Sequence, residues 1–359
     1  MPSRASDAAT TDAANNDPRR ATGEPVRWGI VSTGHIARVV GEQLRSLEDA
    51  RIQAVSSRGA DRAEAFARDL GAARWYHDDD AGSGVEHLAA DDAVDVAYVA
   101  APHAQHHAIA RTLLDAGKHV LLEKAFAVTA AEAEDLVAIA RRRGRFLMEA
   151  LWTRFLPVYE ALAQRLADGA IGTPRWAQAD LGMAERFDPA SRLWARDAGG
   201  GALLDLAVYP LAWTVAAFGL PSEVRAHGIL AENGVDAMTS LDLGHPGGER
   251  AHVLVSLISA HTRTVTIAGD AGTIRTLAPL PNPPGFLVTR GDETTEVRPA
   301  LLGPPYAYQL REVTRCVQRG ALESERMPLA DTLALMRLLD DARSQIGVRY
   351  PNDDTAPGR

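Results

Sequence analysis

Val26-Arg27-Trp28-Gly29-Ile30-Val31-Ser32-Thr33-Gly34-His35-Ile36-Ala37 is the stretch that decides the fold. Its opening residues, up to Val31, predict a short buried strand, and Ser-Thr-Gly then predicts a tight turn. The apolar residues that follow have helical spacing and indicate an amphipathic helix: Ile36, Val39, Val40, Leu44 and Leu47. A strand, a glycine-containing turn and a helix in this order are typical of the first unit of a parallel α/β sheet.

The same alternation continues along the N-terminal part of the chain. Asp61 can cap one helix, and Thr129 with Glu132 forms the capping-box pattern that opens another. Strands are expected at 51–55, 94–101, 119–124 and 145–151, and helices at 61–70, 106–114 and 129–143. We therefore predict an α/β fold whose residues 26–150 form a Rossmann domain with a doubly wound parallel sheet.

After residue 150 the pattern changes. Strand-like runs follow one another with few helices between them, and turns such as Asp270-Ala271-Gly272 favour antiparallel hairpins. The expected strands are 175–183, 222–231, 236–243, 250–259, 263–268, 272–277, 285–290 and 294–298, with helices at 158–167, 202–218, 306–319 and 329–346. We predict a second, α+β domain at residues 151–350 with a large, mainly antiparallel open sheet. A disordered extension is expected at residues 1–25 and a tail at residues 351–359.

Composition narrows the class of protein. The 359 residues include 38 Lys plus Arg and 47 Asp plus Glu, and the resulting net charge of -9 argues against a nucleic-acid-binding surface. Cys316 stands alone, so neither an intramolecular disulfide nor a cysteine-bound metal is expected. The longest apolar stretches are about ten residues, short of the ~20 that span a membrane. We expect a cytoplasmic enzyme with a small-molecule substrate and with no metal, nucleic-acid or membrane partner.

The turn after the first strand is a candidate phosphate-binding site. A dinucleotide pyrophosphate needs free backbone N–H groups at a helix N-terminus and no side chain in its way. In the GxGxxG/A pattern Ser32 replaces the first glycine, Gly34 is the second and Ala37 takes the third, small position. The candidate cofactor contacts are Ser32, Thr33, Gly34, His35 and Ile36. The alternative is an ordinary strand-to-helix turn.

The end of the second strand bears on the choice of cofactor. NAD enzymes carry an acid there for the ribose 2′-hydroxyl, but this strand ends Ser56-Ser57-Arg58, with no carboxylate before Asp61. Hydroxyls and a guanidinium suit a 2′-phosphate, so Ser57 and Arg58 favour NADP, with NAD left open. The alternative is that Arg58 is a solvated loop residue.

The loop Ala101-Pro102-His103-Ala104-Gln105-His106 follows a strand end and should line the nicotinamide side of the site. Ala101, Pro102, His103 and His106 are therefore candidate cofactor contacts. His106 is a candidate for a positioning role, and the alternative is that it only begins the next helix.

Two further motifs carry groups for proton transfer. Glu123 and Lys124 end a very apolar strand, and a lysine beside a nicotinamide ring can hydrogen-bond a substrate hydroxyl. The alternative for Lys124 is an ion pair with Glu123 or Glu149. Asp205 and Tyr209 are four residues apart in an apolar helix and share a face. A tyrosine whose pKa is lowered by a nearby lysine can exchange a proton with a carbinol oxygen, and the alternative is a Tyr–Asp bond that only fixes the helix.

These motifs, in this order, resemble the glucose–fructose oxidoreductase/inositol dehydrogenase (Gfo/Idh/MocA) family over about residues 26 to 350. Residues 146–157, the stretch Gly199 to Asp205 and the ending at 340–351 resemble the branch that contains trans-1,2-dihydrobenzene-1,2-diol dehydrogenase and NADP-dependent D-xylose 1-dehydrogenase. There are two departures from the family pattern: Ala125 stands where the motif has proline, and Ser32 stands where the fingerprint has its first glycine.

The resemblance implies hydride exchange between NADP(H) and a CH–OH group of a sugar, polyol or cyclic diol. Lys124 matches the family's motif lysine beside Glu123, Tyr209 matches the proton-transfer tyrosine, and Asp205 matches the acid beside it. Trp152 and Arg154 match positions near the nicotinamide and the substrate. An open sheet pairs subunits in this family, which implies a homodimer.

The sequence leaves the substrate unnamed. Residues 183–197 carry Arg186, Arg192, Trp194 and Arg196, of which Arg192 is the candidate substrate contact; the alternative is a solvated face. Two other functions stay open: an oxidoreductase that recycles a tightly bound cofactor on one substrate, and a non-catalytic NADP-binding regulator.

Overall fold

The first sheet is built from the predicted N-terminal alternation. The computed structural model describes residues 17–355. Strands β1 (Val26–Val31), β2 (Ala50–Ser56), β3 (Arg74–Tyr76), β4 (Val96–Val99), β5 (His119–Leu122) and β6 (Leu147–Glu149) lie in the order β3-β2-β1-β4-β5-β6. All their pairings are parallel. The strand order reverses between β1 and β4, so a crevice opens at their carboxyl ends, where open α/β sheets bind ligands.

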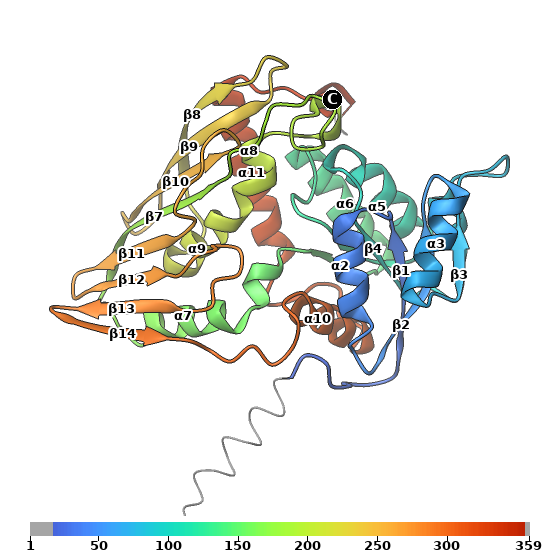
Figure 1. Ribbon diagram of the computed structural model, residues 1–359, viewed down its shortest axis with the longest axis horizontal. Coiled ribbons are helices and arrows are strands. Elements are labelled where there is room, and N and C mark those ends of the chain that lie inside the picture. Colours follow the sequence, from blue (N-terminus) through green and yellow to red (C-terminus); the bar gives the residue numbers. More distant parts are fainter. Residues whose placement is uncertain (1–16, 356–359) are drawn as a thin grey trace, which may run out of the picture.

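Helices cover both faces of this sheet (Figure 1). They are α2 (His35–Leu44), α3 (Ala60–Leu70), α4 (Gly84–Ala89), α5 (His106–Asp115) and α6 (Ala130–Arg143). The capping box of α6 is confirmed, because the Thr129 side chain accepts from the Glu132 N–H and the Glu132 side chain bonds back. Asp61 is not a cap: Gly59 takes that position, and Asp61 lies in the first turn of α3. The expected doubly wound fold is therefore confirmed, with β3 and α4 as additions.

The second sheet is larger and mainly antiparallel, as predicted. Its strands are β7 (Pro174–Gly182), β8 (Glu223–Leu230), β9 (Asp236–Gly244), β10 (Arg250–Ser256), β11 (Val265–Gly269), β12 (Thr273–Thr276), β13 (Phe286–Arg290) and β14 (Glu293–Val297), in the order β14-β13-β12-β11-β7-β10-β9-β8. Among these strands β7 and β10 pair in parallel, and the other pairings are antiparallel. The turn Asp270-Ala271-Gly272 joins β11 and β12 as an antiparallel hairpin, as expected.

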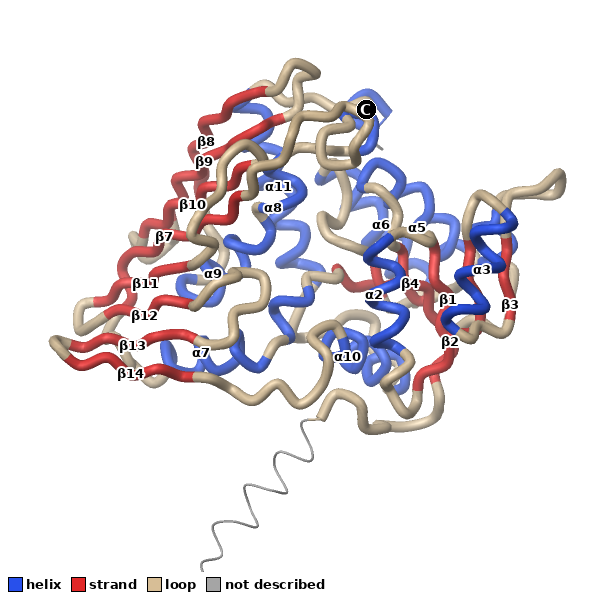
Figure 2. The backbone as a smooth tube through the Cα atoms, viewed as in Figure 1, coloured by secondary structure: helices blue, strands red, loops and turns tan. Residues whose placement is uncertain are grey.

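Helices lie on one face of this sheet, between it and the first sheet (Figures 1 and 2). They are α7 (Pro157–Ala167), α8 (Ala202–Leu206), α9 (Val208–Phe218) and α11 (Leu329–Ile346). Along β9 the burial alternates, so that Leu241 and Leu243 are buried while Ser240 and Asp242 are partly exposed. The described residues therefore leave the other face of the sheet uncovered.

One long helix was expected at residues 202–218, but two helices, α8 and α9, meet at Ala207. Pro210 gives the reason: it has no N–H to donate to the carbonyl of Leu206, so a continuous helix loses a bond there. The run Arg196–Phe218 is apolar and long enough to cross a membrane by length and composition, but 72% of its most apolar part is buried inside the molecule. An apolar run that is mostly buried inside the molecule is typical of a core helix.

After the second sheet, the chain returns to the first sheet. Helix α10 (Ala307–Gln318) packs against α2 and β1. Its Arg311 forms an ion pair with Asp49 (2.6 Å) and donates to the Pro18 carbonyl and the Thr22 hydroxyl, both at 2.9 Å. Of the expected disordered extension, residues 1–16 lie outside the described residues, whereas residues 17–25 are held by these contacts.

Candidate active site

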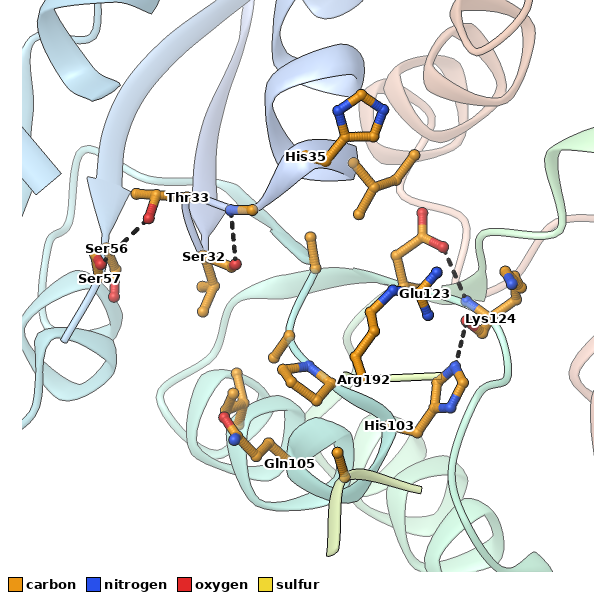
Figure 3. A pocket seen from close by; sticks show the side chains of 18 of the residues that line it. Ser32, Thr33, His35, Ser56, Ser57, His103, Gln105, Glu123, Lys124 and Arg192 are labelled. Carbon is orange, nitrogen blue, oxygen red and sulfur yellow. Dashed lines mark hydrogen bonds between the residues drawn. The ribbon is translucent and has the colours of Figure 1, made fainter. Parts of the chain in front are cut away.

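A pocket of about 680 Å³ lies at the carboxyl ends of the first sheet's strands and extends to the second domain's helices. It brings together most of the residues singled out from the sequence. Those that line it are Ser32, Thr33, Gly34, His35, Ile36, Ser57, Arg58, Ala101, Pro102, His103, Glu123, Lys124, Trp152, Arg192, Asp205 and Tyr209. Figure 3 shows the pocket with the Ser32 turn on one side and Lys124 on the other.

The Ser32 turn presents backbone N–H groups to this pocket. Gly34 is the N-cap of α2, and α2 has no side-chain cap, so its first-turn N–H groups stay available to an anion. Ser32 has φ 97°, a conformation that glycine adopts readily and other residues rarely. Its Oγ accepts from the Gly34 N–H at 3.2 Å. Serine therefore takes the backbone conformation that the missing first glycine would supply.

The end of β2 adds polar groups next to this turn. The hydroxyls of Thr33 and Ser57 are 3.5 Å apart, and the exposed Arg58 lines the same part of the pocket. Arg62, in the first turn of α3, also lines the pocket and was missed in the sequence. The sequence did contain a signal for Arg62, because Arg58 and Arg62 flank the start of a predicted helix. Two guanidinium groups, rather than one, thus stand at the end of β2.

Lys124, Asp205 and Tyr209 meet at the other side of the pocket. The Lys124 ammonium donates to the Asp205 carbonyl oxygen at 2.8 Å and to Asp205 Oδ1 at 3.2 Å. It also lies 5.0 Å from the centre of the Tyr209 ring. The Tyr209 hydroxyl accepts from the Trp152 indole N–H at 3.3 Å. Lys124 therefore pairs with Asp205, and the alternative pairing with Glu123 or Glu149 is not the one formed.

Arg192 also reaches this cluster. Its Nη1 donates to Asp205 Oδ1 at 2.9 Å, so one carboxylate oxygen accepts from two cations. The Arg192 side chain is 63% exposed, whereas the Asp205 side chain is only 6% exposed. In Figure 3 Arg192 points into the pocket between His103 and Glu123. Arg192 is thus the cation of the cluster most accessible to a bound molecule.

The pKa values of this cluster are set by burial and by the charges of its neighbours. Burial alone would raise the pKa of Asp205, but Lys124 and Arg192 hold it far below the usual value. Burial alone would lower the pKa of Lys124, but Asp205 and Tyr209 raise it above its usual value. Burial raises the pKa of Tyr209, and Lys124 offsets this only partly. The expected lowering of the Tyr209 pKa is therefore outweighed, and the phenol is protonated near neutral pH.

His103 and His106 behave differently from each other. His103 lines the pocket, and its two ring nitrogens lie 2.9 Å from the Gly199 carbonyl oxygen and 3.1 Å from the Lys124 carbonyl oxygen. His106 was expected to contact the cofactor, but it is fully buried behind the wall. Its ring nitrogens face the carbonyl oxygens of Ala101 (2.8 Å) and Ala125 (3.0 Å). His106 thus connects two loops, because helix α5 begins at it and turns its ring inward.

Arg154 was also expected near the cofactor, and the structure places it elsewhere. Its Nη1 forms an ion pair with Asp331 at 2.9 Å, and it does not line the pocket. The short helix Trp152–Phe155 explains the difference, since it points Trp152 and Arg154 in different directions. Ala125, which replaces the family's proline, follows Lys124 through a cis peptide bond.

An aromatic wall completes the pocket. Trp152 packs against Tyr306 with ring centres 4.4 Å apart and against Tyr209 with ring centres 6.5 Å apart. Tyr306, just before α10, was missed in the sequence, since no motif surrounds it and it lies far from the other site residues along the chain. Glu123, which also lines the pocket, is largely buried and accepts from the Tyr98 hydroxyl at 2.6 Å and from the Lys124 backbone N–H at 3.2 Å. Burial raises the pKa of Glu123.

Comparison with known proteins identifies the family of this chain. Residues 26–151 match the model of the Gfo/Idh/MocA oxidoreductase family, NAD-binding Rossmann fold, and residues 159–275 match its C-terminal domain. The chain is 38% identical over 342 residues to trans-1,2-dihydrobenzene-1,2-diol dehydrogenase of Mus musculus, with 91% of this chain and 99% of that protein covered. The same enzyme of Sus scrofa is 37% identical over 340 residues, with the same coverage.

Solved structures agree on the fold. A 3-ketoreductase from Actinomadura kijaniata, solved in complex with NADP and TDP-benzene, has a TM-score of 0.81 and 26% identity, covering 90% of this chain and 98% of that one. An aldose-aldose oxidoreductase from Caulobacter crescentus also has a TM-score of 0.81 at 22% identity, covering 90% of this chain and 97% of that one. At that identity the second likeness bears on the fold alone.

Proposed function

The chain belongs to the Gfo/Idh/MocA family of NAD(P)-dependent oxidoreductases, and from that premise we propose that it transfers hydride between NADP(H) and a ring CH–OH group of a sugar, polyol or cyclic diol. The observation that carries this proposal is the buried cluster of Lys124, Asp205 and Tyr209 in one pocket with the Ser32 turn. A proton-handling group and a dinucleotide cradle in one pocket are what such a reaction needs.

The residues present fit a dinucleotide. The uncapped N-terminus of α2 offers N–H groups to a pyrophosphate, and the turn before it carries no large side chain. When bound, the nicotinamide supplies or accepts the hydride at its C4. Ala101, Pro102 and His103 form the wall nearest to that ring in this proposal, because they follow β4 at the point where the strand order reverses.

The chain's own groups handle the proton. In the reducing direction, the protonated Tyr209 hydroxyl donates its proton to the substrate oxygen as the carbon gains the hydride, which gives the alcohol. The Lys124 ammonium lies beside the Tyr209 ring and stabilises the phenolate that remains. In the oxidising direction the phenolate takes the hydroxyl proton back. Asp205 keeps Lys124 charged and in place through both steps.

Arg58 and Arg62 support NADP over NAD. They stand at the end of β2 beside Ser57, where a 2′-phosphate would meet two guanidinium groups. Asp78 also lines the pocket, but its Oδ1 accepts from the Gly84 N–H at 2.9 Å, so it is engaged at the start of α4. This preference is tested by comparing the dissociation constants of NADP+ and NAD+.

The walls of the pocket support a ring-shaped, hydroxylated substrate. Trp152 and Tyr306 offer an aromatic surface to the apolar face of a ring, and Lys124 and Arg192 offer donors to its oxygens. We also propose a cytoplasmic homodimer in which the uncovered face of the eight-stranded sheet pairs two subunits. The dimer is tested by the molar mass in solution.

One experiment tests the proposed activity. Aldoses, polyols and cyclic diols are assayed in parallel with NADP+ and NAD+, and formation of the reduced nucleotide is followed by absorbance. Turnover with at least one substrate class is expected, faster with NADP+. Purified protein that retains nucleotide and converts a single substrate without net NADPH change would instead indicate a recycling cofactor. Nucleotide binding with no turnover on any substrate would indicate a regulator.

A further inference from the structure

Tyr350 is far along the chain from the residues that line the pocket, and it does not line the pocket itself. Its side chain is 1% exposed, and its hydroxyl donates to the Gly200 carbonyl oxygen at 2.5 Å. Gly200 is the middle residue of the turn Gly199-Gly200-Gly201, which leads into α8 and so to Asp205. We propose that Tyr350 is a positioning residue, which holds this turn so that Asp205 stays in contact with Lys124. The inference rests on the proposed function of that cluster.

The glycine turn is held by backbone bonds to the loop before it, and the N–H groups of its three glycines donate at 3.1, 3.0 and 2.8 Å to the carbonyl oxygens of Arg196, Ala195 and Leu193. Gly199 and Gly201 have φ 75° and 122°, where glycine is favoured, and a side chain on Gly201 would collide with Asp236. Helix α8 is short, so few internal bonds hold Asp205 in place. The Leu203 N–H in its first turn is satisfied by the Asp236 carboxylate at 2.7 Å. The position of Asp205 therefore depends on these backbone bonds and on the side chains that bond the turn.

Two side chains also bond carbonyl oxygens of the turn. The His103 ring lies between the carbonyl oxygens of Gly199 and Lys124. The Tyr350 hydroxyl holds the carbonyl of Gly200. Removal of the Tyr350 hydroxyl leaves the Gly200 carbonyl buried without this donor, a loss that the turn relieves by moving.

Tyr350 is itself fixed by the segment around it. Its backbone N–H donates to Asp353 at 2.8 Å, and Asp353 pairs with Arg343 at 3.0 Å, whose guanidinium lies 5.2 Å from the Tyr350 ring centre. Asn352 donates to the Ala104 carbonyl at 3.2 Å, in the same loop as His103. The segment thus contacts both the loop after β4, which lines the pocket, and the glycine turn, which leads to Asp205.

Tyr350→Phe removes only the hydroxyl and keeps the buried ring. We expect hydrogen exchange at the amides of residues 199–206 to accelerate about fivefold, because the turn loses one buried hydrogen bond. We also expect kcat per nucleotide-binding site to fall about tenfold, with the dissociation constant of NADP+ unchanged, because misplacement of Asp205 affects the reaction and not the cofactor. Counting nucleotide-binding sites removes any effect of a smaller folded fraction.

Tyr308→Phe is the matched control. Tyr308, on α10, is also buried, and its hydroxyl accepts from the Leu302 N–H at 2.8 Å, away from the glycine turn. This variant should leave both the exchange at 199–206 and the kcat per site as in wild type. Asp353→Asn, which loosens the same segment from outside, should act in the direction of Tyr350→Phe but less strongly, and it serves if Tyr350→Phe does not fold.

Hydrogen exchange separates this inference from the proposed function, since it needs no substrate. Exchange at 199–206 that is the same in Tyr350→Phe and Tyr308→Phe overturns the positioning role, whatever the enzyme turns over. Faster exchange with kcat per site within twofold of wild type overturns the link to Asp205. A wild-type enzyme that turns over no substrate overturns the proposed function, and the exchange data still decide whether Tyr350 holds the turn.

Discussion

Lys124 Nζ lies 2.8 Å from the backbone oxygen and 3.2 Å from the side-chain Oδ1 of Asp205, so one residue holds the ammonium by two different groups. The backbone contact depends on the path of α8, and the side-chain contact depends on charge. Substitutions at Asp205 can therefore remove the charge and leave the ammonium tethered. In the proposed function this pair is the centre of the proton-transfer group.

Tyr209→Phe should lower kcat by about 10²–10⁴-fold, the usual size of a general acid–base contribution. The ring packing against Trp152 is kept, so NADP+ should bind as in wild type. Steady-state turnover measures the change in kcat, and fluorescence titration with NADP+ measures cofactor binding. Turnover equal to wild type would exclude Tyr209 as the proton donor.

Asp205→Asn should shift the pH dependence of turnover. Burial lowers the pKa of Lys124, while Asp205 and Tyr209 raise it to a net value above the ordinary one. Without the carboxylate, burial dominates and the pKa of Lys124 falls, so the high-pH limb of kcat should move to lower pH. In wild type, the raised pKa stabilises the folded state fully below about pH 10, the unfolded value, and this is lost as the pH rises through the folded pKa.

The control for Asp205→Asn is Asp331→Asn, which breaks the ion pair with Arg154 outside the pocket. It should lower the melting temperature without moving the high-pH limb. Profiles of kcat and melting temperature between pH 6 and 10 make the comparison, because the high-pH limb should enter this range in Asp205→Asn and stay above it in wild type and in Asp331→Asn. Identical shifts in both variants would mean that the limb reports stability and not Lys124.

Arg58→Ala and Arg62→Ala should each weaken NADP+ binding by about 10- to 100-fold, the loss expected for a charge-assisted contact to phosphate. NAD+ lacks the 2′-phosphate, so its dissociation constant should change little. Arg68→Ala is the control, because Arg68 lies exposed on the same helix and does not line the pocket. Equal weakening of NADP+ and NAD+ would assign the arginines to another role.

Ser32→Gly and Ser32→Ala together measure the backbone strain in the turn. Both remove the hydroxyl that accepts from Gly34, but only glycine relieves φ 97°. The glycine variant should be more stable than the alanine variant by about 1 kcal/mol. Chemical denaturation of both variants gives the difference. An alanine variant as stable as the glycine variant would show that Ser32 relaxes to negative φ in solution.

Glu149→Gln should make stability less dependent on pH. Burial raises the pKa of Glu149 to about 7, above its unfolded value, so the folded state binds this proton more tightly. Its stabilising effect is complete at low pH and is lost as the pH rises from about 4 to 7. Glutamine keeps an acceptor for the Thr332 hydroxyl. The variant should therefore gain stability relative to wild type at pH 8 and not at pH 5, as measured by denaturation.

Local patterns in the sequence predicted the fold well, because each element carries its own signal. Buried strands such as Val96–Val99 are continuous apolar runs, and the Thr129 capping box specifies the start of its helix. The break between α8 and α9 was missed because the apolar pattern continues through Ala207, and only the missing N–H of Pro210 interrupts the bonding.

The site was less predictable where residues meet across the fold. Lys124 and Asp205 were both predicted as site residues. Their ion pair was not predicted, because it depends on how the two domains pack. Tyr306 was missed because no motif surrounds it, and an aromatic residue before a helix is usually part of the core. His106 was assigned to the cofactor because its loop follows a strand end, but the turn into α5 separates its buried side chain from that of His103.

The return of α10 to the first sheet has a consequence for synthesis on the ribosome. Helix α10 packs against α2 and β1, and its Arg311 ties down residues 18–22, yet it is made almost 300 residues after them. At roughly 5–20 residues per second, the nascent N-terminal sheet waits on the order of tens of seconds for this helix. Until then the surface that α10 covers stays exposed on the emerging chain, at a stage when exposed surface favours aggregation.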